Sequence, residues 1–315
     1  MNERTFVLKG TICYSNSLTE LSITENGYLV CEDGRCAGVF DELPEKFAGI
    51  SCTDFGDELI IPGLTDLHLH APQYTFRASG MDLELLDWLN TYTFPQEARY
   101  EDTEFAKEAY SIFTEDMKKS PNTRACIFGT LHVPATEILM EQLDKTGIKA
   151  MVGKVNMDRN GSLALQEASA VVSAKDTVRW LEETTGKYEN VKPILTPRFT
   201  PSCSDELMTR LAEIQRTYRL PVQSHLSENK SEIAWVKELC PNTSSFYGEA
   251  YDQFGLFGGE QCPTIMAHCV YSSDAELSLM KERGVFIAHC PQSNTNLSSG
   301  IAPTRRYIEE GLHIG

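Results

Sequence analysis

The order of apolar and polar residues changes its character near residue 60. Up to that point, short apolar runs such as Phe6-Val7-Leu8 and Tyr28-Leu29-Val30 are interrupted by the dipeptides Asn26-Gly27 and Asp33-Gly34. Both dipeptides are strong signals for the tight turns of β-hairpins. The pattern therefore predicts β-structure for residues 1–60, built from strands that are joined by short turns.

From residue 59 onward, apolar runs of strand length alternate with amphipathic stretches of helical period. The helical period is clear in 204–219, where Leu207, Leu211 and Ile214 recur. A capping box at 273–276 predicts the start of another helix. Seven runs have the character of strands: 59–67, 125–131, 149–155, 192–196, 221–225, 264–268 and 285–289.

This repeated alternation of strand and helix favours a parallel sheet with helical crossovers. An open, doubly wound sheet would require a glycine-rich phosphate turn after its first strand, but His68 and His70 occupy that place. We therefore predict an α/β fold in which residues 61–315 form a (β/α)8 barrel of the TIM type. Leu312-His313-Ile314 has the pattern of the first residues of an eighth strand, so we expect this chain to be truncated before that strand ends.

Composition and charge narrow the range of partners. The 315 residues are 41% hydrophobic and 23% charged, which is ordinary for a globular chain, and the formal net charge is -17. Such an acidic chain is a poor partner for nucleic acid or for an anionic membrane surface, because both attract basic patches. No apolar run approaches the ~20 residues of a membrane span, and the first residues lack the pattern of a secretory signal.

The 10 cysteines are scattered without C-x-x-C pairs. A chain of this size does not depend on disulfides for stability, so we expect reduced thiols and a cytoplasmic location. Cys31 and Cys36 flank the turn at 32–35 and are expected to be cross-strand neighbours. A disulfide between them is the less favoured alternative.

Five of the seven histidines stand at the ends of predicted strands: His68, His70, His225, His268 and His289. Chemistry in a parallel barrel gathers at the carboxyl ends of the strands. Because His68 and His70 are two residues apart, they point to the same face and are placed to share one ion, with Zn–N distances near ~2.0–2.1 Å. A single histidine of this kind would be interpreted as a hydrogen-bonded core residue, but several at equivalent strand ends favour a metal site. Iron would suit such ligands as well as zinc.

Glu228 follows His225 within one loop turn. A carboxylate in that place is close enough to take a proton from a water that a divalent ion has made acidic, and to deliver the proton to a substrate. The alternative is an acidic residue that complements the dipole of the helix predicted at 229–239. The neighbouring histidine favours the first interpretation.

The segment Pro62-Gly63-Leu64-Thr65-Asp66-Leu67-His68-Leu69-His70 resembles the signature of the amidohydrolase superfamily. Members of that superfamily combine a (β/α)8 barrel with a small β-sandwich, and residues 1–60 would form the N-terminal part of the sandwich. Within the superfamily, the chain resembles the guanine deaminase family. The segments that carry this closer resemblance are 68–74, 153–158, 196–199, 225–228, 289–294 and 297–300.

The resemblance implies which residues perform the chemistry. His68, His70 and His225 would bind one zinc ion per subunit. His268 would hydrogen-bond the attacking hydroxide and Glu228 would shuttle its proton, and His225, His268 and Glu228 would also contact the substrate. The family has a further ligand, an aspartate at the end of the eighth strand, and we expect it beyond the last residue of this chain.

The resemblance also implies that Gln73 and Arg198 recognise the purine, with Phe199 beside its ring. The residue types suit this task, since Gln73 offers both a donor and an acceptor, and Arg198 offers a planar fork of donors for the O6 and N7 edge. Structural alternatives remain open for all three. Arg198 would then be an ordinary ion-pairing arginine, Phe199 a core residue, and Gln73 the cap of the next helix.

The implied reaction is hydrolytic deamination of guanine to xanthine and ammonia by a zinc-activated hydroxide, a step of purine catabolism or salvage, in a homodimer. One alternative is a related enzyme that acts on another aminopurine or an S-triazine-like substrate, and a second is a non-catalytic scaffold protein of the same fold. A two-metal site bridged by a carbamylated lysine is disfavoured, because Lys154 lies on the third predicted strand whereas such a lysine ends the fourth.

Overall fold

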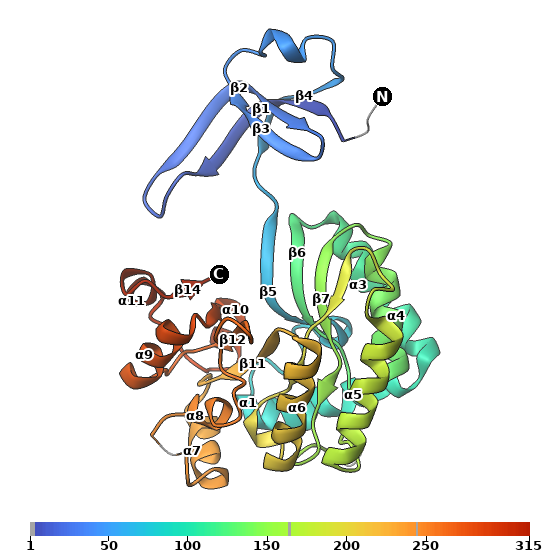
Figure 1. Cartoon of the computed structure of the whole chain (residues 1–315), viewed down its shortest axis with the longest axis vertical. Helices are drawn as coiled ribbons and strands as arrows, with labels where there is room; N and C mark the ends of the chain where they lie inside the picture. Colours follow the sequence, from blue (N-terminus) through green and yellow to red (C-terminus); the bar gives the residue numbers. More distant parts are fainter. Residues whose placement is uncertain (1–3, 163–164, 244) are drawn as a thin grey trace. The chain divides into compact units, whose positions relative to one another are not determined.

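The computed structural model describes residues 4–162, 165–243 and 245–315. The chain divides into two compact units, Met1–Leu64 and Thr65–Gly315, which Figure 1 shows in the colours of the sequence.

The first unit is a four-stranded sheet with the order β3-β2-β1-β4. Its strands are β1 (Phe6–Ser15), β2 (Leu21–Glu32), β3 (Arg35–Phe40) and β4 (Cys52–Ile60), and a short 3₁₀ turn, η1 (Glu45–Phe47), precedes β4. β1 pairs antiparallel with β2 and parallel with β4. Val7, Val30 and Phe47 form a small buried core over this sheet, so the β-structure expected for the first sixty residues is present.

One of the two predicted turns is wrong. β2 continues through Asn26-Gly27, where Asn26 has a φ of 52° and the pairing with β1 shifts register. A left-handed residue serves a β-bulge as well as a turn, so the dipeptide alone does not distinguish the two. The second turn, at Asp33-Gly34, is confirmed between β2 and β3, and it places Cys31 opposite Cys36 with both thiols free.

The second unit contains parallel strands in two sheets, β5-β6-β7-β9 and β11-β12-β13-β14. Hydrogen bonds between Leu195 and residues 221 and 223 connect the end of the first sheet to β11. The strands are β5 (Leu64–His70), β6 (Asn122–Phe128), β7 (Lys149–Gly153), β8 (Val155–Asn156), β9 (Val191–Pro193), β10 (Thr196–Pro197), β11 (Val222–Leu226), β12 (Thr264–His268), β13 (Phe286–Ala288) and β14 (His313–Ile314).

β8 and β10 pair with each other and continue β7 and β9, so these strands occupy eight positions in barrel order. β14 pairs parallel with β13, which confirms that residues 313 and 314 belong to an eighth strand. A Cβ added to Gly315 would lie 2.8 Å from the Leu67 side chain of β5, so the two ends of this series of strands are in contact. The predicted barrel architecture is confirmed.

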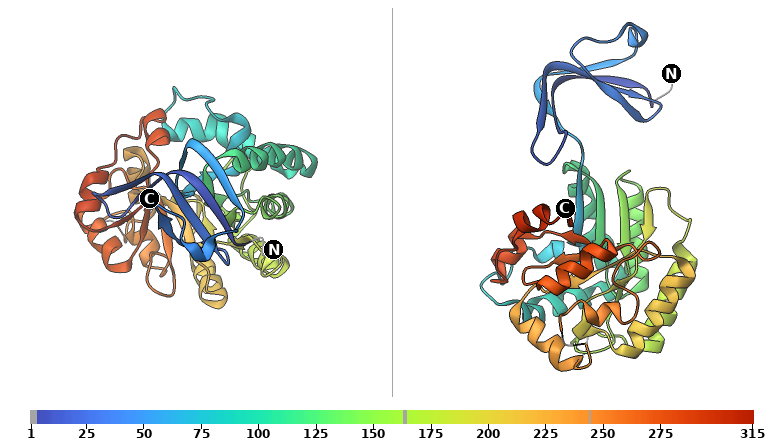
Figure 2. Two further views of the ribbon diagram at one scale, coloured as in Figure 1. Left: turned by 90° about the horizontal axis from the view of Figure 1, so that it is seen from above. Right: turned by 60° about the vertical axis from the view of Figure 1, so that its left-hand side comes forward.

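Helices cover the outside of the strands, as the view from above in Figure 2 shows. The longer ones are α3 (Thr103–Lys119), α4 (Val133–Asp144), α5 (Ala170–Thr184), α6 (Asp205–Tyr218), α7 (Lys230–Leu239) and α9 (Asp274–Arg283), and the shorter ones are α8 (Glu249–Asp252), α10 (Pro291–Asn296) and α11 (Thr304–Glu309). The helix predicted over 204–219 and the helix start predicted at 273–276 are confirmed. The Ser204 side chain caps α6, and the Ser273 side chain caps α9. No helix within the described parts of the chain is both long enough and apolar enough to pass through a membrane.

A series of short turns connects β5 to α3. It consists of η2 (Ala71–Phe76), α1 (Leu85–Trp88), a π-helical turn η3 (Leu89–Thr93), α2 (Phe94–Ala98) and η4 (Arg99–Glu101). Several of its residues reach the functional site, as described below.

A buried ion pair lies where β7 gives way to β8. The Lys154 ammonium group pairs with the Glu167 carboxylate, and both side chains are almost fully buried. The second oxygen of Glu167 accepts the backbone N–H of Met157 at 3.0 Å. Lys154 is therefore occupied in binding Glu167, which in turn holds the backbone of Met157.

We predict that Lys154→Met destabilises the fold by about 3–5 kcal/mol, because it leaves the Glu167 carboxylate buried without a counter-charge. Equilibrium urea unfolding measures the loss. The matched control is Lys145→Met, which removes the exposed pair with Glu141 and should cost less than about 1 kcal/mol. Adding Glu167→Gln to Lys154→Met should recover part of the loss, and equal stability of the single and double variants would contradict the explanation.

Candidate active site

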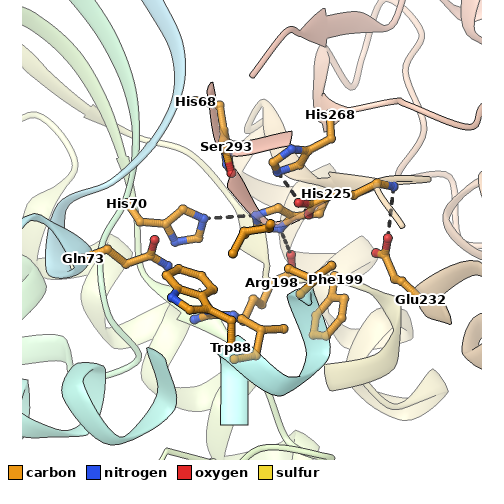
Figure 3. A pocket seen from close by; sticks show the side chains of 14 residues that line it. His68, His70, Gln73, Trp88, Arg198, Phe199, His225, Glu232, His268 and Ser293 are labelled. Carbon is orange, nitrogen blue, oxygen red and sulfur yellow. Dashed lines mark hydrogen bonds and ion pairs between the residues drawn. The ribbon is translucent and has the colours of Figure 1, made fainter. Parts of the chain in front are cut away.

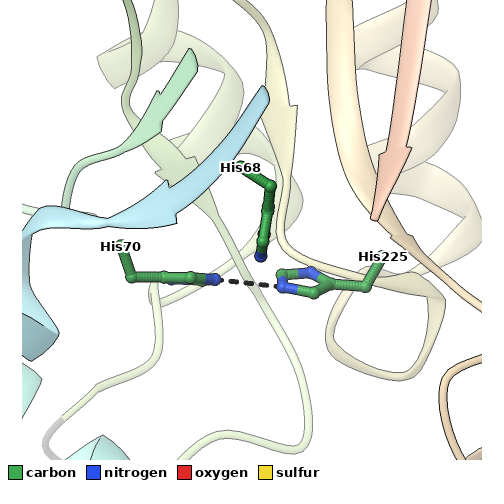
Figure 4. A group of neighbouring side chains, drawn as sticks. All are labelled: His68, His70 and His225. Carbon is green, nitrogen blue, oxygen red and sulfur yellow. Dashed lines mark hydrogen bonds between the residues drawn. The ribbon is translucent and has the colours of Figure 1, made fainter. Parts of the chain in front are cut away.

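Three imidazoles from two strands converge at the carboxyl end of the barrel (Figure 4). His68 and His70 come from β5, and His225 comes from β11. Their ligand atoms all lie within 4.8 Å of one another, and the Nε2 atoms of His70 and His225 are 3.0 Å apart. The spacing of two residues on β5 therefore has the effect predicted from the sequence, since both rings point to the same side.

A backbone carbonyl fixes the proton on the His225 ring. His225 Nδ1 donates to the carbonyl oxygen of Arg198 at 2.6 Å, and a carbonyl oxygen only accepts. The lone pair of the neutral ring is then on Nε2, which is the atom directed at His70. Proteins commonly orient a metal-binding histidine through a hydrogen bond from the ring nitrogen that does not bind the metal.

The three rings fit a divalent cation. Burial lowers the pKa of His68, His70 and His225 well below the usual value, and the positive charges that neighbouring histidines would carry lower it further. The rings are therefore neutral, as metal ligands must be. Two nitrogens that each lie ~2.0–2.1 Å from one tetrahedral zinc ion are about 3.3 Å apart. The 3.0 Å between His70 and His225 is close to this separation.

His268 stands beside this group at the end of β12. Its Nδ1 pairs with the side-chain oxygen of Asn294 at 2.7 Å, and its Nε2 lies 3.3 Å from a carboxyl oxygen of Glu228. Because the Asn294 oxygen is an acceptor, the His268 proton is on Nδ1 and the Nε2 lone pair faces Glu228. Burial lowers the pKa of His268, so this ring too is neutral.

Glu228 is buried beside the histidines rather than serving as the N-cap of α7, which is Asn229. Burial raises the pKa of Glu228 to about 7, although the hydrogen bond from Ser299 Oγ at 3.1 Å opposes the shift. A carboxyl group with this pKa gains and loses a proton easily near neutral pH, as a proton carrier must.

Glu232 was not predicted as a site residue, and it lies one helical turn beyond Glu228. It accepts the backbone N–H of Glu228 at 3.0 Å and the hydroxyl of Tyr247 at 2.9 Å. Burial, and then the nearby Glu228 carboxyl, raise the pKa of Glu232 to about 7. In the sequence, Glu232 is the last residue of a capping box with Asn229, and that signal indicates only a helix start.

The site residues that the resemblance implied all line one cavity, of which Figure 3 gives a close view. They are His68, His70, Gln73, Arg198, Phe199, His225, Glu228 and His268. The other lining residues were not predicted from the sequence: Leu85, Trp88, Leu89, Glu232, Ser293 and Leu297. His289, which also follows a strand, is not among the residues that line this cavity. The cavity therefore combines a cluster of imidazoles and carboxyl groups with apolar walls.

Two of the three predicted base contacts also make internal bonds. The Arg198 guanidinium group pairs with Glu97 at 2.5 and 3.1 Å, so the ion-pair alternative for this residue is realised even though Arg198 lines the cavity. The Gln73 amide nitrogen donates to the same carboxylate at 2.9 Å. Phe199 is buried with its ring edge-on to Trp235, at 6.3 Å between ring centroids.

The amidohydrolase family model matches residues 59–315, and the chain belongs to this family. Among characterised relatives, guanine deaminase of Mus musculus is 45% identical over 259 residues, which are 82% of this chain and 56% of the mouse protein. Guanine deaminase of Dictyostelium discoideum is 38% identical over 327 residues, which cover 98% of this chain and 72% of that protein. The chain thus spans little more than half the length of the mouse relative.

The crystal structure of guanine deaminase from C. acetobutylicum, which has guanine bound in its active site, superimposes with a TM-score of 0.94 at 47% identity. The superposition covers 98% of this chain and 73% of that protein. The predicted resemblance to the guanine deaminase family is therefore confirmed in sequence and in fold.

The raised pKa of Glu228 predicts a pH dependence of stability in metal-free protein. The carboxyl pKa is about 4.3 in an unfolded chain and about 7 in the fold. Between these values the folded state holds a proton that the unfolded state releases, so the free energy of unfolding falls as the pH rises, by up to about 1.4 kcal/mol per pH unit.

Glu228→Gln should remove this contribution, so the free energy of unfolding of the variant should fall less steeply between about pH 5 and pH 7. Urea unfolding of chelator-treated wild type and variant at several pH values measures the two slopes. Glu232 titrates in the same range, and loss of the Glu228 carboxyl removes one cause of its raised pKa, so the difference between the slopes reports both carboxyl groups and has the same sign. Identical slopes would show that Glu228 is not the group that holds the proton.

Proposed function

We propose that this protein converts guanine and water to xanthine and ammonia. The observation that carries the proposal is the single cavity in which three metal-competent imidazoles, a carboxyl group with a pKa near 7 and the polar groups of Gln73 and Arg198 all meet. The mouse and Dictyostelium relatives are named guanine deaminases, and the similar C. acetobutylicum guanine deaminase has been crystallised with guanine in its active site.

His68, His70 and His225 would hold one divalent ion, with zinc as our proposal and iron as the alternative. When bound, such an ion acts as a Lewis acid and makes water acidic near neutral pH. Burial keeps the three rings neutral, and the Arg198 carbonyl holds the His225 proton on Nδ1 so that Nε2 is free; these features support the assignment.

Glu228 moves the protons in this proposal. It takes a proton from the attacking water and delivers it to a ring nitrogen of guanine next to C2, while a C–O bond forms at C2. The proton of the hydroxyl group now on C2 then passes through Glu228 to the amino group, the C2–N bond breaks as the C2 carbonyl forms, and ammonia leaves. His268 would hydrogen-bond the attacking oxygen, since its Nε2 atom lies beside Glu228 and its Nδ1 proton is held by Asn294.

Gln73 and Arg198 would bind the polar edges of the base, with Phe199 beside its ring. His225, His268 and Glu228 line the same cavity and would complete the contacts with the substrate. We further propose a homodimer in the cytoplasm that acts in purine catabolism or salvage. The ten free cysteines favour a reducing compartment, and sedimentation or light scattering would establish the assembly.

The first test of the proposal is an ultraviolet assay of guanine conversion to xanthine. We expect turnover that is lost when a chelator removes the metal and returns on addition of zinc or iron. Adenine and an S-triazine serve as control substrates. Equal activity on either of them would favour the related-enzyme alternative, and metal-loaded protein without turnover of any of the three would favour a non-catalytic scaffold.

The second test separates the proton carrier from the metal ligands. Glu228→Gln should retain the metal of the wild type and lose at least about 100-fold in kcat, because it keeps the shape of the side chain and removes its proton-carrying group. Glu282→Gln, on the exposed face of α9, is the matched control and should have wild-type kcat. Near-normal turnover in Glu228→Gln would contradict the assignment.

A further inference from the structure

Glu97 is a buried carboxylate at which both of the predicted base contacts meet. Only 1% of its surface is exposed, and Arg198 is 2% exposed. The carboxylate accepts two hydrogen bonds from the Arg198 guanidinium group and one from the Gln73 amide. The two residues that face the cavity are thus held from behind by a third, which does not itself line it.

This arrangement determines which end of the Gln73 amide is available. An ionised carboxylate that pairs with an arginine has no proton to donate, so the group that Gln73 turns toward Glu97 is its NH₂. The carbonyl oxygen of Gln73 is therefore directed elsewhere, with one fixed orientation. Without Glu97, a free amide would rotate by half a turn and exchange its donor for its acceptor.

Glu97 has a related effect on Arg198. Two nitrogens of the guanidinium group are bound to the carboxylate, and the group lies 5.2 Å from the centre of the Phe94 ring. The positive charge is compensated within the pair, so the cavity offers Arg198 as a set of oriented donors rather than as a free cation. Such a surface suits the carbonyl and ring nitrogen of a neutral heterocycle better than an anionic ligand.

The π-helical turn explains how Glu97 reaches this place. In a regular α-helix, the offset of nine positions from Trp88 to Glu97 would put the two side chains on opposite faces, because 3.6 residues complete a turn. The π turn at Leu89–Thr93 inserts one extra residue and reduces the separation to about 80° around the axis. Trp88 therefore lines the cavity while Glu97 lies behind Gln73 and Arg198.

We propose that Glu97 is a positioning residue for substrate recognition. It fixes the Gln73 carbonyl oxygen as an acceptor for a ring N–H and fixes Arg198 as a donor to the O6 and N7 edge, and so it selects guanine by its pattern of donors and acceptors. This inference depends on the proposed deamination of guanine, and it assigns Glu97 no part in the proton transfer or in metal binding.

The test is Glu97→Gln, with Glu97→Asp as the conservative variant and Glu101→Gln as the matched control from the exposed end of the same segment. Glu97→Gln should raise KM for guanine by about 10- to 100-fold, which is the effect of losing one oriented hydrogen bond to a charged group. We expect kcat to change by less than about threefold and the metal content to stay the same. Glu97→Asp should give an intermediate KM, and Glu101→Gln should match the wild type.

A coupling measurement separates positioning from a merely structural role. Gln73→Ala should raise KM strongly in the wild-type background and little in the Glu97→Gln background, because the amide is already misdirected there. Titration of chelator-treated proteins with guanine, followed by tryptophan fluorescence, should give the same pattern in Kd. If Glu97→Gln fails to fold, the same comparison in Glu97→Asp decides the question.

Two outcomes would overturn the inference while leaving the proposed function intact: an unchanged KM in folded Glu97→Gln, or an equal effect of Gln73→Ala in both backgrounds. A wild-type protein that contains metal and does not convert guanine would instead contradict the proposed function. In that case, guanine binding can still test the inference. If wild type and Glu97→Gln bind guanine with the same Kd, the inference is overturned as well.

Discussion

Parallel pairing of the barrel strands is the constraint on which the site depends. His70 and His225 are 155 residues apart in the chain, and their Nε2 atoms are 3.0 Å apart in the fold. Parallel strands all end at the same side of a barrel, so a residue at one strand end is automatically near those at the others. The barrel keeps this arrangement because the helices between its strands bury their apolar faces. The large core of the second unit stabilises the barrel, and Trp180 and Tyr251 are fully buried in it.

Strand geometry alone does not complete the cluster. In the register of β11 and β12, Leu226 lies opposite His268, so alternation would direct the His268 ring away from the face of His225. His268 instead has a φ of 74°, and its ring stacks on His225 with centroids 5.5 Å apart. Ser227, with a φ of 47°, turns the chain in the same way directly before Glu228. Left-handed conformations are uncommon for residues with a Cβ, and they tend to gather at functional sites.

These features explain what the sequence could and could not predict. The pairs His68–His70 and His225–Glu228 could be proposed from the sequence because each pair is local, the first as two residues on one strand and the second as a strand end with the loop that follows it. Glu97 was missed because it meets Arg198 across 101 residues of sequence, and no local pattern distinguishes it from other acidic residues on helices. The wrong turn at Asn26-Gly27 has a similar cause, since a local signal with two structural outcomes is decided by the neighbouring strand.

The positions of the ring protons in the site are a property of the fold rather than of a ligand. His225 donates a hydrogen bond from Nδ1 to the backbone carbonyl of Arg198, and His268 donates one from Nδ1 to the side-chain oxygen of Asn294. Both rings therefore present Nε2 as a lone pair, the one toward His70 and the other toward Glu228. The two acceptors are held in place, because one is main chain and the other is a buried side chain within the short helix α10. The fold itself therefore sets the direction of both Nε2 lone pairs before any ligand or substrate enters.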